Sequence, residues 1–265
     1  MIQREIVTSR ANPLVKRMRA LRADSARSGL TVLEGFKLAE EALAAGVAIV
    51  ECAMTPEALD GSRASLAVLL AKSGAAVRVL APDVLASVSE AESTQGMLAI
   101  ARRPVFDEEQ IFRGTPLLVV GVAIQNPGNV GALLRAAEAA GATGAYFTEH
   151  SADPMSWKAL RGSMGSAFRV PHVTGLRAAD ALARLAARGV TAIAAVSSHG
   201  DRYDSADLTR PVAFLLGNEG AGLPAEVEAR ADRRVAIPMA PPVESLNVAV
   251  AAGILLFEAA RQRRR

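Results

Sequence analysis

The sequence predicts a two-domain α/β protein whose C-terminal domain contains an open, mostly parallel sheet. Short apolar runs alternate with helical stretches along most of the 265 residues, a spacing typical of strands joined by helical crossovers. The run LLVVGVAI at 117–124 is apolar throughout, as expected of a parallel strand buried on both faces. The stretch PVFDEEQIFRGTP at 104–116 combines charge with proline and glycine. We therefore predict domains at 1–104 and 116–265, joined by a linker at 105–115.

The smaller N-terminal domain is expected to be a compact α/β module. Its predicted helices lie at 12–27, 36–46 and 63–74, its predicted strands lie at 31–35, 47–55 and 76–80, and the stretch 96–103 closes it. The C-terminal domain follows the same alternation. Its predicted strands lie at 117–124, 144–148, 191–197, 212–217 and 234–239, and its predicted helices lie at 131–141, 177–189 and 244–261.

The composition indicates a globular protein with an aliphatic core. Hydrophobic residues make up 51% of the chain and aromatic residues only 4%, so Ala, Val and Leu must fill the interior. The longest apolar runs, such as 248–257, are too short to span a bilayer, and the N-terminus lacks the apolar segment of a secretory signal. Cys52 is the single cysteine, which excludes an internal disulfide and a cysteine-based metal site. We therefore expect a cytoplasmic protein without membrane association.

Positive charge is concentrated at both ends of the chain. The net charge is only +3, yet residues 1–30 contain seven basic residues against two acidic ones, and the chain ends in RQRRR (261–265). Such ends suit a phosphate backbone. A solvated helix face with a solubilising tail explains the pattern equally well, so charge alone gives only a weak indication of a nucleic-acid partner.

Three polar loops follow strands of the predicted parallel sheet. They are QNPGNVGALLR (125–135), GNEGAGLP (217–224) and APPVESLN (240–247). Ligands bind beyond the carboxyl ends of the strands in open parallel sheets, so we expect these loops to build one site. Ser245 and Asn247 can also cap the helix that follows them.

Other sites are not supported by the sequence. There is no G-x-G-x-x-G after the first strand of the C-terminal domain and no G-x-x-x-x-G-K-[ST], which argues against a dinucleotide dehydrogenase and a P-loop enzyme. His150, His172 and His199 lack ligand spacing, so we expect no metal site and interpret each as a surface or capping histidine. No G-x-S-x-G elbow is present.

The three loops together carry a family resemblance. NPGNVGALLRAAEAAG (126–141), LLGNEGAGLP (215–224) and IPMAPPVESLNVAVAAGILLFE (237–258) resemble, in order and spacing, the three motifs of the SpoU (TrmH-like) RNA ribose 2′-O-methyltransferases. The N-terminal stretches TSRANPLVKRMRAL (8–21), LEGFKLAEEAL (33–43) and TQGMLAI (94–100) are similar to the RNA-binding domain of many members. The resemblance therefore covers nearly the whole chain.

The resemblance implies a fold, a cofactor and partners. It implies a C-terminal α/β domain of the SPOUT type, in which the chain is tucked through a loop to form a trefoil knot; general rules of topology would have rejected a knot. It also implies S-adenosylmethionine as methyl donor without a metal, a homodimer, and structured RNA as substrate. Ribosomal RNA, most specifically 23S ribosomal RNA, is the preferred substrate, with tRNA as the alternative.

The motif positions imply roles for particular residues. Gly217, Ile237 and Leu246 would line the S-adenosylmethionine site, although Gly217 could also simply end a strand. Glycine permits close backbone approach and Ile and Leu supply apolar walls. The implied catalytic residues are Arg135, Asn129, Glu219, Ser245 and Asn247.

Arg135 is the family's implied activator of the ribose hydroxyl. A guanidinium is almost never deprotonated, so we interpret Arg135 as a group that positions a phosphate and stabilises developing oxyanion charge. The structural alternative is a surface arginine paired with Glu138 at i+3. The other four residues would hold the ribose and the loops, and the proton acceptor is left open between an RNA phosphate and solvent.

The sequence departs from the family pattern at one place, and two other functions are alternatives to the methyltransferase. Family members often have glycine where this chain has Pro241 and Pro242, which fix φ and lack N–H donors, so residues 240–243 are the least secure part of the match. A non-catalytic RNA-binding or ribosome assembly factor would have no need to retain all five polar residues. A small-molecule enzyme would leave the basic N-terminus unexplained.

Overall fold

The computed structural model describes residues 2–23, 28–91 and 94–264 and consists of two compact units. The first unit comprises the chain up to Val105 together with Met155–Phe168, and the second comprises Phe106–Pro154 with Arg169–Arg265. The segment Met155–Phe168, which sequence reasoning assigns to the C-terminal domain, thus belongs to the first unit. The end of the predicted helix at 24–27 lies outside the described residues.

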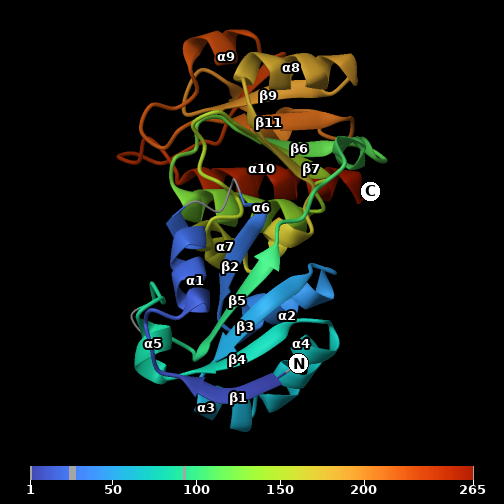
Figure 1. Cartoon of the computed structure of the whole chain (residues 1–265). Coiled ribbons are helices and arrows are strands. Elements are labelled where there is room, and N and C mark those ends of the chain that lie inside the picture. The colour runs from blue at the N-terminus through green and yellow to red at the C-terminus, as the bar shows by residue number, and fades with distance from the viewer. Residues whose placement is uncertain (1, 24–27, 92–93, 265) are drawn as a thin grey trace. The chain divides into compact units, whose positions relative to one another are not determined.

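The first unit is built on a mixed five-stranded sheet with the strand order β1-β4-β3-β5-β2 (Figure 1). Strands β1, β4 and β3 pair in parallel, whereas β5 pairs antiparallel with both β3 and β2. Its elements are β1 (Ile2–Val7), α1 (Pro13–Ala23), β2 (Leu30–Glu34), α2 (Phe36–Ala44), β3 (Ile49–Met54), α3 (Pro56–Asp60), α4 (Ala64–Lys72), β4 (Ala76–Leu80), α5 (Pro82–Ala86), β5 (Met97–Arg102), α7 (Trp157–Ser163) and the 3-10 turn η2 (Ser166–Phe168).

Helices α1 and α5 bury apolar stripes against one face of this sheet. Leu14, Met18 and Leu21 of α1 repeat at helical spacing and pack with Val32 and Leu98 of the strands. Helix α1 lies within the helix that the sequence predicts at 12–27. These side chains form one hydrophobic cluster of the first unit.

The second unit contains a seven-stranded sheet in which every neighbouring pair is parallel, in the order β10-β12-β9-β11-β6-β7-β8. The predicted parallel sheet is therefore confirmed. Its elements are η1 (Glu108–Phe112), β6 (Leu117–Gly121), α6 (Pro127–Ala140), β7 (Gly144–Thr148), β8 (His172–Leu176), α8 (Ala178–Ala187), β9 (Thr191–Val196), β10 (Asp201–Arg202), η3 (Tyr203–Ser205), β11 (Val212–Leu216), α9 (Ala225–Ala229), β12 (Arg233–Ala236) and α10 (Val248–Arg263).

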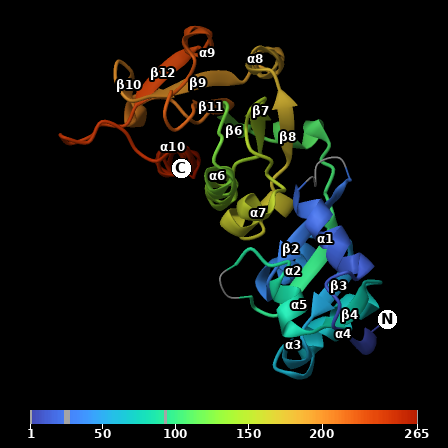
Figure 2. The same ribbon diagram turned by 60° about the vertical axis from the view of Figure 1, so that its left-hand side comes forward.

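Helices cover both faces of this sheet. Helices α8 and α9 lie on one face, and α6 and α10 lie side by side on the other (Figure 1). Figure 2 shows β8 at one end of the sheet and β10 and β12 near the other. The central strands β6 and β11 are buried along their whole length, which explains why their sequences are continuously apolar. No helix among residues 2–23, 28–91 and 94–264 is long and apolar enough to cross a membrane.

Hydrogen bonds to Glu108 hold η1, the first turn of the second unit, in place. The buried Tyr146 hydroxyl donates to Glu108 Oε1 over 2.5 Å, and Arg184 Nη1 donates to Glu108 Oε2 over 2.6 Å. Burial raises the pKa of Glu108, but the hydrogen bonds from Tyr146 and Arg184 outweigh burial and hold that pKa below its ordinary value. Burial and the bond to Glu108 raise the pKa of Tyr146. Turn η1 is thereby tied to β7 and α8.

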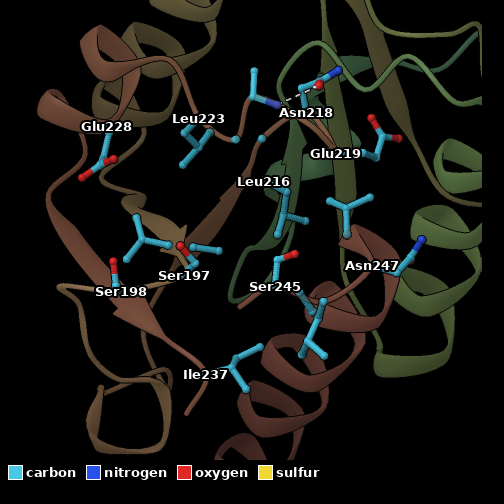
Figure 3. Close-up of a pocket in the computed structure, with 18 of the residues that line it drawn as sticks. Ser197, Ser198, Leu216, Asn218, Glu219, Leu223, Glu228, Ile237, Ser245 and Asn247 are labelled. Carbon is cyan, nitrogen blue, oxygen red and sulfur yellow. Dashed lines mark hydrogen bonds between the residues drawn. The ribbon is translucent and has the colours of Figure 1, made fainter. Parts of the chain in front are cut away.

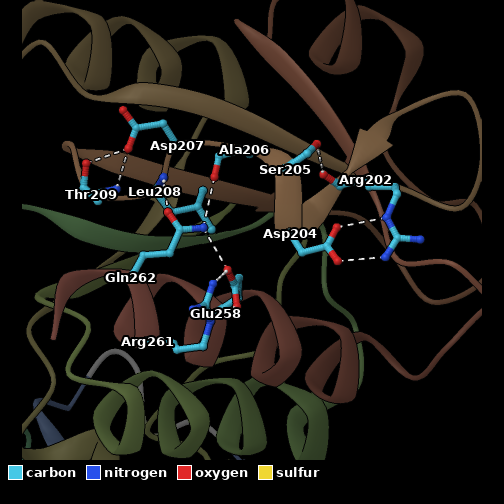
Figure 4. A network of polar contacts seen from close by, with 10 residues as sticks. All are labelled: Arg202, Asp204, Ser205, Ala206, Asp207, Leu208, Thr209, Glu258, Arg261 and Gln262. Atoms are coloured by element: carbon cyan, nitrogen blue, oxygen red, sulfur yellow. Dashed lines mark hydrogen bonds and ion pairs between the residues drawn. The ribbon is translucent and has the colours of Figure 1, made fainter. Parts of the chain in front are cut away.

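The C-terminal turn of α10 is held by a second polar network (Figure 4). Gln262 Oε1 accepts from the Leu208 N–H over 2.9 Å, and its Nε2 donates to the Ala206 carbonyl over 3.0 Å. Arg263 donates to the carbonyls of Leu208, Thr115, Pro116 and Arg210. Gln262 and Arg263 of the basic C-terminus therefore bind other segments of the second unit.

Candidate functional site

The loop after β11 closes on itself at Gly217. The backbones of Asn218 and Gly222 exchange two hydrogen bonds of 3.0 and 2.9 Å. A Cβ atom at position 217 would lie 2.1 Å from the carbonyl carbon of Gly222, closer than any real contact. Glycine at 217 is therefore required by the crossing of two backbone segments. The alternative that Gly217 merely ends a strand does not account for this crossing.

Asn218 organises the same loop and ties it to a neighbouring strand end. Its Oδ1 accepts from the N–H groups of Gly220 and Ala221 over 2.9 and 3.2 Å, and its Nδ2 donates to the Ala123 carbonyl over 3.0 Å. Ala123 has a φ of 52°, a left-handed conformation that is rare for alanine. Sequence reasoning did not single out Asn218, because its main partner is 95 residues away.

The segment before α10 brings the third motif to the same place. Asn247 caps the helix, since its Oδ1 accepts from the N–H groups of Ala249 and Val250 over 2.9 and 3.4 Å. Ser245 lies outside the helix and does not share this capping role, so the expectation that either residue could cap the helix is corrected for Ser245. The bond between Pro241 and Pro242 is cis.

A hydrogen-bonded trio connects the three predicted loops. Asn129 Nδ2, from the first turn of α6, donates to Glu219 Oε1 over 2.7 Å. Asn247 Nδ2 donates to Asn129 Oδ1 over 3.0 Å. The Asn129 amide thus spans the loop after β11 and the start of α10. One side chain therefore joins Glu219 and Asn247, which lie 90 and 118 positions away from it in the sequence.

The trio lies beside a cavity of about 690 Å³. Figure 3 shows Ser245, Leu216 and Ile237 along its wall, with Glu219 and Asn247 on one side. The predicted residues on its lining are Gly217, Glu219, Ile237, Ser245, Leu246 and Asn247. The volume falls within the range of about 300–1,000 Å³ that is usual for small-molecule sites. Six of the eight predicted site residues therefore line one cavity, and Asn129 contacts two of them.

A fourth strand end also contributes to the cavity. Ser197, Ser198 and His199 follow β9 and line it, and His199 has a φ of 60°. Sequence reasoning missed this loop because it treated 191–197 only as a strand and His199 as a surface residue. The pairing of β9 with both β11 and β12 could have indicated its place, but strand order is not readable from a single sequence.

Arg135 lies apart from the cavity lining. It occupies α6, six residues after Asn129, and its side chain is exposed. The alternative of a pair with Glu138 is not found, because Glu138 binds Arg169, with Arg169 Nη2 donating to Glu138 Oε2 over 3.0 Å. Among the described residues, Arg135 forms no ion pair. Its guanidinium is available to a ligand, and no desolvation penalty applies to it.

The chemistry of the cavity suits a ligand that is partly apolar and cationic. Its wall combines apolar side chains such as Leu216 and Ile237 with the carboxylates of Glu219 and Glu228, and no Lys or Arg lines it. S-adenosylmethionine joins an uncharged nucleoside to a sulfonium cation and an amino-acid zwitterion, so its net charge is positive and it fits this lining. Within the ranges described, no group of three or more His, Cys, Asp or Glu is arranged to hold a metal ion.

The parallel sheet, with a cavity at the ends of its strands, fits a methyltransferase of the SPOUT class, and comparison with known proteins gives the family. Residues 116–257 match the SpoU rRNA Methylase family, and the chain belongs to this family. Residues 12–99 match the MRM3-like substrate binding domain.

Individual relatives extend the match over nearly the full chain. An uncharacterized tRNA/rRNA methyltransferase of Synechocystis is 35% identical, with 97% of this chain and 94% of the relative covered. The 23S rRNA (guanosine(2553)-2′-O)-methyltransferase RlmP of Bacillus subtilis is 30% identical, with 95% and 97% covered. The crystal structure of an AdoMet-bound rRNA methyltransferase from Sinorhizobium meliloti is similar with a TM-score of 0.85 and 31% identity, over 97% of this chain and 98% of that one.

Proposed function

We propose that this protein transfers a methyl group from S-adenosylmethionine to a ribose 2′-hydroxyl of ribosomal RNA, most specifically 23S ribosomal RNA. The observation that carries the proposal is the trio Asn129, Glu219 and Asn247, which joins the three motif loops beside the 690 Å³ cavity. The relative from Bacillus subtilis is named for this reaction. The substrate-binding match at 12–99 supports a large RNA substrate, and such a protein acts in the cytoplasm.

The cavity would hold the cofactor. Ile237 and Leu246 supply apolar wall, and Gly217 lets the backbone of its loop approach closely. S-adenosylmethionine, when bound, supplies an electrophilic methyl group. The carboxylate of Glu219 favours a cationic ligand at the rim. These residues bind and orient; none of them needs to change its covalent state.

The polar residues at the rim would position the ribose. Asn129, Glu219, Ser245 and Asn247 offer hydrogen-bond donors and acceptors there. In the reaction the 2′-oxygen would form a bond to the methyl carbon while the bond from that carbon to the sulfonium sulfur breaks and leaves a neutral thioether, and the hydroxyl proton would leave to an RNA phosphate or to solvent. Arg135 would bind a neighbouring phosphate and stabilise the developing negative charge on the oxygen. Its exposure and lack of an acidic partner among the described residues support this role.

We further propose that the protein acts as a homodimer through α10. Val250 and Phe257 lie seven residues apart on α10 and so share one face of the helix, and they are 52% and 48% exposed. Exposed apolar stripes of this kind mark interfaces, and a second copy of the chain is the proposed partner. Phe257→Glu should shift the protein to monomer in sedimentation analysis. The matched change Val68→Glu, at another exposed apolar residue, should leave the oligomeric state unchanged; equal behaviour of both variants would contradict the proposal.

The direct test is methyl transfer. Labelled S-adenosylmethionine is incubated with the protein and with total RNA, ribosomal subunits and assembly intermediates from cells that lack the gene. We expect label at a single ribose 2′-oxygen of ribosomal RNA, mapped by resistance of the adjoining phosphodiester bond to alkali. Cofactor binding without transfer to any of these substrates would overturn the proposal, and label on tRNA alone would overturn the substrate.

A further inference from the structure

A second cavity lies within the first unit, between helix α7 and residues that follow strand β2 or precede strand β5. Its volume is about 190 Å³, and its lining includes Leu38, Gln95, Trp157, Leu160, Arg161 and Met164. We call it the Trp157 cavity. It is below the volume of about 300–1,000 Å³ that is usual for whole small-molecule ligands, and it has no lining residue in common with the 690 Å³ cavity.

The helix that forms one wall is firmly attached to the first unit. The buried Thr31 hydroxyl donates to the Met155 carbonyl over 2.7 Å. A Cβ atom at Gly165 would lie 2.6 Å from the Cβ of Glu41, so the chain after α7 runs directly against α2. The wall of the Trp157 cavity is therefore preformed.

The indole ring of Trp157 is held by a buried arginine. The guanidinium of Arg22 lies 5.4 Å from the ring centroid, a cation–π distance. Arg22 Nη2 also bonds Glu34 Oε2 over 2.7 Å, with side chains only 7% and 8% exposed. Within the described ranges, Arg22 Nε and Nη1 have no hydrogen-bond partner, and Nη1 lies 3.8 Å from Glu90 Oε1, so the ring is a substantial part of the environment of this guanidinium. Trp157 is thus a rigid aromatic surface that lines a small opening.

Polar and basic groups surround this aromatic surface. Arg161, one turn further along α7, is exposed and lies 5.7 Å from the ring centroid. It pairs with no carboxylate among the described residues. Gln95 contributes an amide to the lining, and its Oε1 lies 2.7 Å from where a Cβ of Gly35 would be. Glycine at 35 therefore allows Gln95 to lie across the strand end.

We propose that the Trp157 cavity binds one unpaired base of the RNA substrate, with Arg161 on the adjoining phosphate. Unpaired bases are recognised by stacking on aromatic rings and by hydrogen bonds to their edges, and the cavity offers a ring, an amide and a cation together. This inference rests on the proposed function and adds a second point of RNA contact outside the methyl-transfer site. It explains why a protein with only 4% aromatic residues places its single tryptophan at a partly open position.

That single tryptophan makes the test specific, because all indole emission comes from Trp157. The probes are unstructured oligo(U), oligo(A) and oligo(C) ribonucleotides and the 23S ribosomal RNA. We expect saturable quenching of the emission on addition of RNA. Unchanged emission at RNA concentrations that saturate binding, measured by filter retention, would overturn the inference and favour a protein segment as the occupant.

Substitutions separate stacking from charge. Trp157→Ala should weaken RNA binding by roughly 5- to 150-fold, the range for loss of one stacked base, and Trp157→Phe should restore part of it by supplying a ring. Arg161→Gln should weaken binding and reduce its salt dependence by about one phosphate contact. The matched control is Lys158→Gln, an exposed cation on the same helix that does not line the cavity. Equal losses for Arg161→Gln and Lys158→Gln would overturn the assignment.

Two further measurements distinguish this inference from the proposed function. The affinity of each variant for S-adenosylmethionine should remain at the wild-type value, because the two cavities are lined by different residues. If the wild-type protein methylates RNA but RNA leaves Trp157 emission unchanged, only this inference fails. If RNA quenches the emission but no methyl transfer occurs to any RNA, the proposed function fails.

Discussion

The Asn129 amide shows how one side chain can hold two loops at fixed positions. Its Nδ2 donates to Glu219 while its Oδ1 accepts from Asn247, so both ends of the amide dipole are used. A residue of another size or polarity would satisfy at most one partner. Position 129 therefore controls the spacing of the motif loops.

Gly217 leads to a prediction at the residue scale. Gly217→Ala forces the added methyl against the backbone of Gly222, so the loop must open, and we expect S-adenosylmethionine affinity to fall by at least about tenfold, which corresponds to about 1.4 kcal/mol. The matched control is Gly220→Ala, where the nearest atom to a new Cβ is 3.6 Å away and φ is unrestrictive. Isothermal calorimetry measures both variants. Equal affinities for the two would contradict the close-approach argument.

Arg135 leads to a second residue-scale prediction. Arg135→Ala removes an exposed cation that does not line the cavity, so we expect turnover to fall by about 100-fold or more, as for loss of a charge-stabilising donor. S-adenosylmethionine affinity should stay within about twofold of wild type. Arg230→Ala, at another exposed arginine, is the control. Wild-type turnover in the Arg135 variant would remove this residue from the mechanism.

Sequence reasoning could find the site residues that follow parallel strands, but not those defined by tertiary contacts. Polar residues in glycine- or proline-rich loops after apolar strands directed attention to Glu219 and Asn247. Asn218 lies in the same loop, yet its importance depends on a carbonyl in a different strand end. The loop at 197–199 was missed for the same reason. The catalytic role of each residue stays a prediction.

At the scale of elements, helix α6 shows how local signals can mislead. The sequence prediction began this helix at Gly131, whereas α6 begins at Pro127 with Asn126 as its cap. Proline is favoured in the first turn because its missing N–H is not needed there. The predicted start of the last helix is wrong in the opposite direction, because α10 begins at Val248 and the prediction placed its start at 244. Short elements such as β1, α3 and α7 were not predicted because they carry too few apolar repeats.

The end of α10 gives a prediction at this scale. Arg263 donates to four carbonyl groups, and burial lowers its pKa, so Arg263→Ala should lower the free energy of unfolding by about 1–2 kcal/mol. Arg261, two residues earlier, is 53% exposed and pairs with Glu258, whose carboxylate keeps its hydrogen bond from Gln262, so the change of Arg261 to alanine should cost less. Urea denaturation compares the two variants. A larger loss for Arg261→Ala would contradict this distinction.

At the scale of the whole molecule, charge that seemed available for RNA is partly used by the fold. Arg17 and Arg22 of the basic N-terminal helix bind Glu51 and Glu34 over 2.6 and 2.7 Å, and Arg263 binds carbonyls. Fewer of these cations are therefore free to bind RNA than the sequence indicates, because two are paired with carboxylates and the donors of Arg263 are occupied by carbonyls. Ion pairing depends on residues distant in sequence, which a count of charges cannot include.

The core of the first unit gives a pH prediction for the molecule. Burial raises the pKa of the Cys52 thiol from 9.0 to about 12. The unfolded chain loses this proton near pH 9 while the folded chain keeps it, so the contribution of Cys52 is fully present below pH 9.0 and is lost as the pH rises toward 12. Unfolding in urea below and above pH 9.0 should show this decline. Cys52→Ala should show a shallower decline, and an identical decline would contradict the assignment.

The division of the chain has a consequence for biosynthesis. The first unit needs residues 155–168, which are separated from its other residues by the segment 106–154 of the second unit. Domains usually fold from the N-terminus as they leave the ribosome, but this unit cannot be completed until the chain has been translated beyond Phe168. Until then, the part of the first unit that the segment 155–168 covers stays exposed to water and to chaperones. This part includes Thr31, which is buried in the complete unit. A gene truncated before residue 155 should therefore yield an N-terminal product that is prone to aggregation and proteolysis.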